Sequence, residues 1–559
     1  MSASVKDTTT LEASLDHVPV ELAFGTSGRR GRVLDLTQLE VYLTVRGELD
    51  FLLTLPRAEG GIRGGDDFLV AADLRPSSTR RTPEGQGELA QVILRAVADA
   101  GLKPVFLGAI PTPALAAYAF AQGLGSLMVT GSHIPFDRNG FKTNRSIGEL
   151  LKPQEAPIAE SVGLRRAQLY KAPYAESPFD ASGRFRVSLP PLPNPDPRAE
   201  EAYLERYRQC FGAEALRGLR ILFYQHSAVG RDLIPAILTA LGAEVICAGR
   251  STEFVPIDTE NIDADCLQTI QELVDQVLQD GQPLDAVVST DGDSDRPLIL
   301  GFQRDSRTLR FFGGDLVGMI TAEALKPDAV IVPISCNDAI DQGPLASVLS
   351  PKTRIGSPFV IEGMEQARAR GCRRVVGFEA NGGFLTGSDL ALGQGQLLAL
   401  PTRDAVLPIL AVLSKARQLN VSLSTLFDRL PHRFSRAGLL KRFPRARAWA
   451  ILEALSPKLE QIAASGGPID RPQIHSKVLQ RLDHYFGPST GFALLRAIDL
   501  TDGLRLLFEN GEVLHLRPSG NADEFRVYAV ADSQPRADAL VALSLEEPLG
   551  LLRRLEQEL

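Results

Sequence analysis

The chain has 559 residues, a formal net charge of −8, and 44% hydrophobic and 23% charged residues. This length allows about three to five domains, and the acidic balance argues against nucleic acid or an anionic membrane as a partner. Five scattered cysteines without a CxxC pair argue against a disulfide framework and a zinc site. The polar N-terminus lacks a signal core, and the apolar runs are too short to span a bilayer. We therefore expect a reduced, cytoplasmic protein.

Short apolar, β-rich runs recur along the chain, and polar or Gly-rich turns and helical patterns follow them. This alternation predicts α/β layers in which ligands bind at the carboxyl ends of strands. Strands are predicted at residues 68–72, 126–129, 219–224, 286–289, 329–334 and 374–376, and helices at 82–100 and 232–241.

Proline content and changes of pattern predict the domain boundaries. The segment 188–197 contains too many prolines for a helix or a central strand, so it closes a first domain. Further boundaries are expected near 303–307 and 431–443, and the hairpin signal at 509–511 makes the last domain α+β. We expect four domains, at residues 1–190, 198–305, 306–432 and 440–559.

Two segments of the first domain carry groups suited to phosphate chemistry. The Gly-rich run 24–31 lets backbone N–H groups approach an anion, and Arg30 adds a guanidinium. The segment Thr130-Gly131-Ser132-His133-Ile134-Pro135 follows a predicted strand, which predicts an exposed Ser132 hydroxyl with His133 and Lys142 nearby. A plain surface turn and a serine bonded to its own loop are the alternatives.

The strongest local signal is three carboxylates within five residues. Asp291, Asp293 and Asp295 follow an apolar strand, and like charges so close together favour a bound cation such as Mg²⁺. An EF-hand is excluded, because Arg296 and Phe302 stand where that loop needs glycine and glutamate. A solvated acidic turn is the remaining alternative.

Two later loops carry groups that suit a phosphorylated sugar. Glu379 and Asn381 lie in the Gly-rich segment 377–384 and can bond vicinal hydroxyls, although a plain capped turn is an equal reading. The segment 517–526 surrounds a turn with two guanidinium groups, which suits a phosphate dianion, or is a hairpin with surface arginines. Its polar groups belong to Arg517, Ser519, Gly520, Asn521 and Arg526.

With these loops in this order from Phe24 to Tyr528, the chain resembles the α-D-phosphohexomutase family, and most of all its phosphomannomutase and phosphoglucomutase branch. The resemblance implies four domains around a central cleft: three related α/β domains with mixed sheets and a smaller C-terminal α+β domain. It implies reversible conversion of a hexose 1-phosphate (mannose or glucose) to the 6-phosphate through a phosphoserine enzyme and a 1,6-bisphosphate. It also implies Mg²⁺ as cofactor, hexose 1,6-bisphosphate as activator and a small sugar phosphate as partner; the oligomeric state stays open.

The same resemblance implies a role for each matching position. Ser132 would carry the phosphoryl group with His133 in its loop, Lys142 would act as general acid or base, and Arg30 would be the arginine of the N-terminal loop. The metal ligands would be Ser132, Asp291, Asp293 and Asp295, with Arg296 after them. The sugar contacts would be Glu379 and Asn381, and the phosphate loop would use Arg517, Ser519, Gly520, Asn521 and Arg526.

Several positions depart from the usual family pattern. Gly131 and Ile134 replace alanine and asparagine, Asn381 and Gly383 replace serine and histidine, and Ser294 replaces glycine. The phosphate loop also reads Ser-Gly-Asn-Ala-Asp in place of Ser-Gly-Thr-Glu-Pro. Phosphoglucosamine mutase and hexose 1,6-bisphosphate synthase therefore stay as alternatives. A sugar-phosphate-binding protein without turnover is a further one, which Ile134 favours. An aspartyl-nucleophile phosphatase is another, against which Asp295 and the remote Arg517 loop argue.

Overall fold

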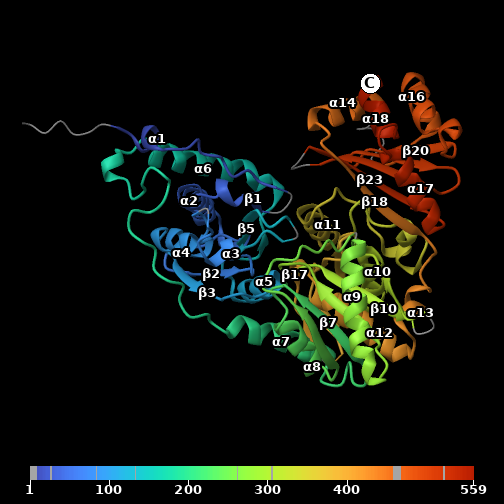
Figure 1. Ribbon diagram of the computed structural model, residues 1–559, viewed down its shortest axis with the longest axis horizontal. Helices are drawn as coiled ribbons and strands as arrows, with labels where there is room; N and C mark the ends of the chain where they lie inside the picture. The colour runs from blue at the N-terminus through green and yellow to red at the C-terminus, as the bar shows by residue number, and fades with distance from the viewer. Residues whose placement is uncertain are drawn as a thin grey trace, which may run out of the picture.

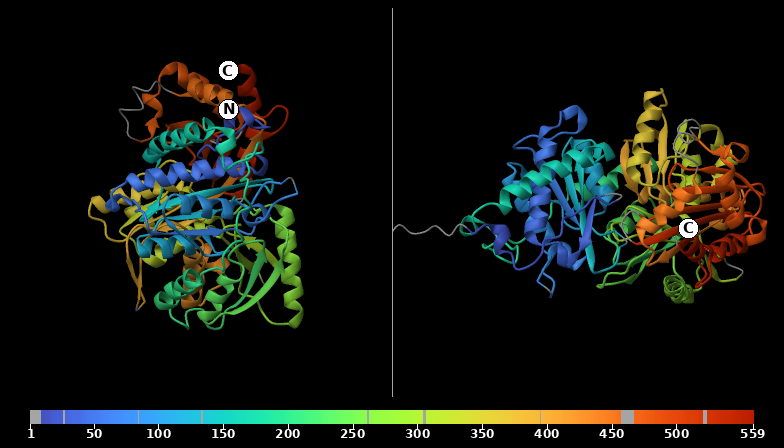
Figure 2. Two further views of the ribbon diagram at one scale, coloured as in Figure 1. Left: turned by 90° about the vertical axis from the view of Figure 1, so that its left-hand side faces the viewer. Right: turned by 90° about the horizontal axis from the view of Figure 1, so that it is seen from above.

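The computed structural model contains four main sheets, and we refer to the segments that contain them, in chain order, as domains I to IV (Figure 1). The structure describes residues 9–25, 28–83, 85–132, 134–260, 262–303, 306–393, 395–456, 467–519 and 523–559. Domain I, in blue, lies at one end of the molecule, and domain IV, in orange and red, lies beside the yellow and green domains (Figures 1 and 2).

Domain I is built on a mixed sheet of order β1-β5-β4-β2-β3, with β6 paired to β5. Its strands are β1 (Arg29–Arg32), β2 (Asp67–Ala72), β3 (Lys103–Phe106), β4 (Ser126–Val129), β5 (Arg138–Arg145) and β6 (Gly148–Glu149). Its main helices are α2 (Gln38–Thr54), α4 (Leu89–Asp99), α5 (Thr112–Gln122) and α6 (Glu155–Tyr170), and the short α1 (Leu11–Ser14) and α3 (Pro76–Thr79) flank them. Alternate residues of β2 belong to two hydrophobic cores, so both faces of this sheet are buried.

Domain II shares the central part of this topology, with a sheet of order β11-β10-β9-β7-β8. In each domain three neighbouring strands run parallel, and the next strand along the sheet is antiparallel. The strands are β7 (Arg220–His226), β8 (Glu244–Arg250), β9 (Ala286–Thr290), β10 (Pro297–Gln303) and β11 (Thr308–Phe311), and the helices are α7 (Arg198–Phe211), α8 (Leu233–Ala240) and α9 (Ala264–Val277).

Domain III has a smaller sheet, β12-β13-β14-β17, in which β12 and β13 are parallel and the others antiparallel. Its strands are β12 (Ala329–Ile331), β13 (Val375–Phe378), β14 (Phe384–Thr386) and β17 (Leu400–Asp404), with a hairpin of β15 (Leu390–Leu392) and β16 (Gly395–Leu397). Its helices are α10 (Gly314–Leu325), α11 (Ser357–Ala369), α12 (Val406–Leu419) and α13 (Leu423–Phe427).

Domain IV differs because its sheet, β18-β23-β22-β21-β20-β19, is antiparallel throughout. The strands are β18 (Phe434–Lys441), β19 (Ile469–Asp470), β20 (Leu495–Asp499), β21 (Leu504–Phe508), β22 (Val513–Pro518) and β23 (Glu524–Ala531). The helices are α14 (Arg445–Leu455), α16 (Ser476–Phe486), α17 (Gln534–Leu545) and α18 (Leu551–Glu558). The expected architecture of three α/β domains and a smaller α+β domain is thus confirmed, whereas the boundaries given above stay predictions.

The four motif loops occupy matching places in these sheets. In domains I to III each loop joins the last parallel strand to the first antiparallel one: β4 to β5, β9 to β10, and β13 to β14. The loop of domain IV joins β22 to β23. The carboxyl end of a parallel strand is where open α/β sheets bind ligands, so the topology places three of the motifs where ligand chemistry is expected.

The helix predicted at residues 82–100 begins only at Leu89. Gly85 and Gly87 adopt φ of 85° and 112°, outside the helical region. A Cβ at Gly87 would lie 2.3 Å from the carbonyl oxygen of Arg80, so the chain turns here before α4 starts. Among the described residues, no helix is both long and apolar enough to cross a membrane.

Asp404 joins domains II and III, and its loss should destabilise the protein. The buried carboxylate accepts hydrogen bonds from the Tyr203 and Tyr207 hydroxyls and, at 2.9 Å, from the Val406 N–H. Asp404→Ala leaves two buried hydroxyls without this acceptor, so the free energy of unfolding should fall by roughly 3 kcal/mol. Asp428→Ala, which breaks the exposed pair with Arg310, should cost only about 0.5 kcal/mol in urea denaturation. Equal losses in the two variants would contradict this account.

Candidate functional site

The structure brings the serine loop of domain I onto the aspartate loop of domain II. The Ser132 hydroxyl donates to Asp291 Oδ2 at 2.9 Å, and Gly292 lies so close that an added Cβ would be 2.7 Å from the Ser132 carbonyl oxygen. Thr112, at the start of α5, bonds Asp293 twice, through its N–H at 3.0 Å and its hydroxyl at 2.8 Å. The two predicted motifs therefore form one site at the interface of the domains.

Ser132 itself is buried, which corrects the prediction of an exposed hydroxyl. It has a left-handed φ of 52° and no accessible surface. The loop does form the tight turn that the sequence predicts, but Asp291 comes from a separate domain and covers the hydroxyl. The sequence around Ser132 carries no information about a side chain from another domain, so burial by Asp291 could not be predicted from it.

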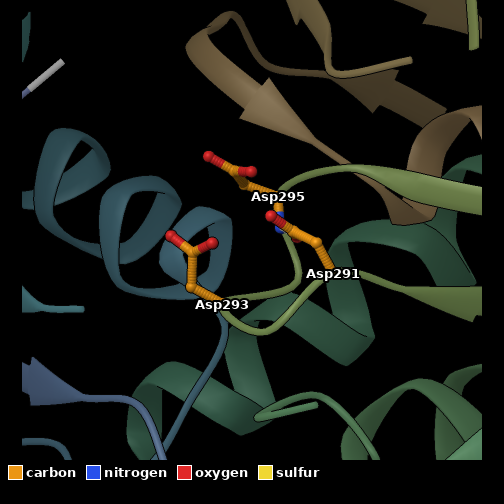
Figure 3. Close-up of side chains that lie close together, drawn as sticks. All are labelled: Asp291, Asp293 and Asp295. Carbon is orange, nitrogen blue, oxygen red and sulfur yellow. The ribbon is translucent and has the colours of Figure 1, made fainter. Parts of the chain in front are cut away.

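The three aspartates form a cluster with the donor chemistry of a metal site (Figure 3). One carboxylate oxygen from each lies within 4.8 Å of the others, and all three residues are buried. Within the described residues, Oδ1 of Asp293 and Oδ1 of Asp295 accept no hydrogen bond. Buried oxygens left in this way fit a hard divalent cation, so the cluster is able to hold a metal ion.

Burial and the surrounding cations shift the pKa values of these carboxyls in different directions. Lys142 on β5 bonds Asp293 Oδ2 at 2.8 Å and Asp295 Oδ2 at 3.0 Å. Burial and the neighbouring Asp293 raise the pKa of Asp291 well above its usual range. Burial also opposes ionisation of Asp295, but Arg403 and Lys142 outweigh it and lower its pKa below that range.

Arg403, on β17, is a site residue that sequence reasoning missed. Its guanidinium bonds Asp295 through Nε at 2.9 Å and Glu379 through Nη1 at 3.0 Å, and all three side chains are buried. It therefore fixes the predicted sugar loop of domain III against the aspartate loop of domain II. Arg403 lies in the strand Leu-Pro-Thr-Arg-Asp, outside the four loops whose sequences suggested a function. No motif therefore marks it.

Arg403 also accounts for one departure from the family pattern. A Cβ at Gly383 would lie 2.4 Å from Arg403 Cδ, so a larger residue there would displace the guanidinium. Asn381 is buried and its Oδ1 accepts from the Gly383 N–H at 2.9 Å, which closes the loop.

Ser294, a third departure from the family pattern, lies in the aspartate loop and adopts a φ of 57°. Its hydroxyl accepts a hydrogen bond from the Gly230 N–H at 3.0 Å and so ties the aspartate loop to the rest of domain II.

Further arginines make the site rich in positive charge. Arg296 lies 3.5 Å from Asp295 Oδ1, and its own N–H donates to Asp291 Oδ1 at 3.3 Å. Burial and the neighbouring Arg296 lower the pKa of the Arg30 guanidinium to about 10. A guanidinium whose pKa is lowered by a neighbouring cation favours an anionic ligand.

Domain IV contributes two arginines from adjacent strands. Arg517 on β22 and Arg526 on β23 are directly paired in the sheet, where like charges are unfavourable unless an anion joins them. Arg517 Nε donates to Asp502 at 3.1 Å, and the Ser519 N–H donates to the Glu524 carbonyl at 2.9 Å. Three predicted site residues, His133, Gly520 and Asn521, lie outside the described residues.

Comparison with known proteins identifies relatives of this arrangement. Three family models match, described as phosphoglucomutase/phosphomannomutase, alpha/beta/alpha domains I, II and III, at residues 21–165, 201–301 and 313–434. A phosphomannomutase of Sinorhizobium fredii is 37% identical over 93% of this chain and 98% of its own. One of Salmonella muenchen is 35% identical over 95% and 96%.

Solved structures of distant relatives share the fold. A phosphoglucomutase/phosphomannomutase family protein from Burkholderia thailandensis has a TM-score of 0.62 at 17% identity, over 92% of this chain and 94% of its own. The open form of pp63/parafusin, a phosphoglucomutase from Paramecium, has a TM-score of 0.58 at 16% identity, over 97% and 96%.

The aspartate cluster should bind one divalent cation. Asp293→Asn removes a negative charge and an anionic ligand, so the Mg²⁺ affinity measured by calorimetry should fall by about tenfold or more. Asp275→Asn changes an acidic residue of α9 in the same domain, outside the cluster, and should leave the affinity unchanged. Equal Mg²⁺ affinity in the wild type and Asp293→Asn, with circular dichroism unaltered, would contradict a metal site here.

Proposed function

Because this chain belongs to the phosphoglucomutase/phosphomannomutase family, we propose that it is a phosphohexomutase that interconverts hexose 1-phosphate and hexose 6-phosphate. The observation that carries the proposal is the hydrogen bond of 2.9 Å from Ser132 to Asp291. It joins a nucleophilic hydroxyl to a carboxylate cluster able to hold a metal. The two relatives of highest identity given above are named phosphomannomutases, so mannose phosphate is the first substrate proposed and glucose phosphate the second.

The reaction needs one phosphoryl group on the enzyme and one on the sugar. Phospho-Ser132 transfers its group to the free sugar hydroxyl: the bond from phosphorus to the Ser132 oxygen breaks, and a bond to the sugar oxygen forms. The sugar hydroxyl loses its proton and the released Ser132 oxygen gains one. The resulting 1,6-bisphosphate reorients within the site, so that its other phosphoryl group faces Ser132. Transfer of that group to Ser132 regenerates the phosphoenzyme. Free hexose 1,6-bisphosphate would act as activator by the same transfer.

Residues of all four domains would divide the remaining tasks. Lys142 lies beside the metal loop and would move the proton as general base or acid. Asp291, Asp293 and Asp295 would hold Mg²⁺, which when bound offsets the charge of the phosphoryl group together with Arg30 and Arg296. Glu379 and Asn381 would contact the sugar. The phosphate that does not react would be held by Arg517, Ser519, Gly520, Asn521 and Arg526, and His133 would support the serine loop.

Two rival functions fit the geometry less well. An aspartyl-nucleophile phosphatase would attack through Asp291 or Asp293, but Asp293 is held by Lys142 and by both groups of Thr112. A protein that only binds sugar phosphates has no use for a serine bonded to the metal loop. We propose that the enzyme works in the cytoplasm, because its five cysteines without a disulfide pattern suit a reducing compartment.

Ser132 should carry the phosphoryl group. After incubation with glucose 1,6-bisphosphate and Mg²⁺, peptide mass analysis should find one phosphate on Ser132, and Ser132→Ala should lower kcat by several orders of magnitude. Ser126→Ala, at a buried serine of the preceding strand, is the matched control and should keep both properties. Phosphate found on Asp291 would instead support the phosphatase reaction.

Arg517 should serve both substrate isomers. A charge-assisted hydrogen bond is worth roughly 1.5–3 kcal/mol, so Arg517→Ala should weaken binding of hexose 1-phosphate and of hexose 6-phosphate by about ten- to a hundredfold. Both losses should be similar, because each phosphate occupies this pocket in turn.

The matched control for this experiment is Arg536→Ala, which breaks the pair with Glu512 elsewhere in domain IV and should change neither affinity. If Arg517→Ala weakened binding of only one of the two phosphate isomers, the bisphosphate could not use this pocket in both of its orientations.

A further inference from the structure

Arg75 is a fully buried arginine that bonds the serine loop at four points. Its Nη1 donates to the carbonyl oxygens of Pro135 and Arg138, both at 2.8 Å, and its Nη2 to those of Ser132 at 3.0 Å and Ile134 at 2.5 Å. The side chain is 1% exposed. One guanidinium therefore collects the carbonyl oxygen of the nucleophilic serine and three from the chain that follows it, up to Arg138.

The other sides of this guanidinium are also occupied. Asp73 lies 3.4 Å from its Nε and accepts a hydrogen bond of 3.2 Å from the Gly131 N–H. The ring of Phe254, from domain II, stacks on the guanidinium with 3.8 Å between the ring centroid and Arg75 Cζ. The serine loop is thus linked through Arg75 to both its own sheet and the neighbouring domain.

Two glycines make this packing possible. A Cβ at Gly131 would lie 2.6 Å from Arg75 Cζ, and one at Gly292 would lie 3.2 Å from the Phe254 ring. Gly131 is a departure from the alanine usual at this place in the family. The departure is explained by the space that the guanidinium occupies, since any side chain at 131 would push against it.

We propose that Arg75 is a positioning residue for phosphoryl transfer, which fixes the Ser132 loop in its reactive conformation and links that conformation to the contact between domains I and II. The inference rests on the proposed role of Ser132 as phosphoryl carrier. A left-handed φ at a serine persists only where the surroundings impose it, and the four bonds of Arg75 impose it here. A carbonyl oxygen that faces Arg75 also cannot face, and repel, an incoming phosphoryl group.

A lysine at this position keeps the positive charge but loses the planar fork. Its ammonium has three donors on a single atom and cannot reach the carbonyl oxygens of four different residues. Arg75→Lys should therefore slow phosphorylation of Ser132 by glucose 1,6-bisphosphate about ten- to a hundredfold, as small displacements of reacting groups do. The dissociation constant of mannose 1-phosphate should change less than about twofold, because its binding groups come from the other domains.

Arg166→Lys provides the matched control. Arg166 is another largely buried arginine of domain I, and its guanidinium bonds Glu40 at 2.6 Å and the Tyr170 hydroxyl at 3.2 Å, away from the serine loop. It should lower the unfolding temperature as Arg75→Lys does and leave the phosphorylation rate unchanged. If the role of Arg75 were purely structural, both variants would instead show the same small effect on the rate of Ser132 phosphorylation.

Phe254→Leu keeps every hydrogen bond of Arg75 and removes only the stacked ring, so it tests the proposal even if Arg75→Lys does not fold. It should slow phosphorylation of Ser132 by a smaller factor, with mannose 1-phosphate affinity unchanged. Wild-type phosphorylation rates in folded Arg75→Lys, or in Phe254→Leu where Arg75→Lys does not fold, would overturn the inference. Absence of phosphate on Ser132 in the wild-type protein would instead overturn the proposed function.

Discussion

Burial of three aspartates on one short loop is the constraint on which the site depends. Carboxylates removed from water need cationic partners, and the domains supply them: Lys142 comes from domain I, Arg296 from the loop itself and Arg403 from domain III. Each partner also belongs to a loop or strand of the site. Charge balance at the aspartate loop therefore aligns the serine loop, the aspartate loop and the loop that carries Glu379 at the same time, and any ligand that changes this balance acts on all three domains.

Two buried arginines hold the loops of the site in place. Arg403 joins the aspartate loop to Glu379, and Arg75 holds the carbonyl oxygens of the serine loop. Each has a glycine beside it where a Cβ would collide, Gly383 for the first and Gly131 for the second. Both glycines are departures from the usual family pattern. They accommodate neighbouring side chains, so they do not by themselves indicate a different sugar or a loss of turnover.

The sequence was a good guide wherever the evidence lay within one short segment. The strands before the serine and aspartate loops, and the α/β character of the first three domains, follow from local patterns. Arg403 and Thr112 could not be found in this way, because they reach the aspartates from other domains and carry no motif. Ser132 was expected to be exposed for the same reason, because Asp291, which covers its hydroxyl, also comes from another domain. The helix predicted at 82–100 begins later than expected, because Gly85 and Gly87 adopt positive φ values outside the helical region.

Conversion of mannose 1-phosphate by the wild-type enzyme, followed by ³¹P NMR with Mg²⁺ and a trace of glucose 1,6-bisphosphate, tests the central claim most directly. A phosphohexomutase converts the 1-phosphate signal into that of the 6-phosphate until equilibrium, without release of inorganic phosphate, and the same mixture forms from mannose 6-phosphate. Glucose 1-phosphate measured in parallel reports the sugar preference. Release of inorganic phosphate would show a phosphatase, and unchanged spectra for both sugars, despite binding, would contradict the account of Ser132 and its metal loop as a transfer site.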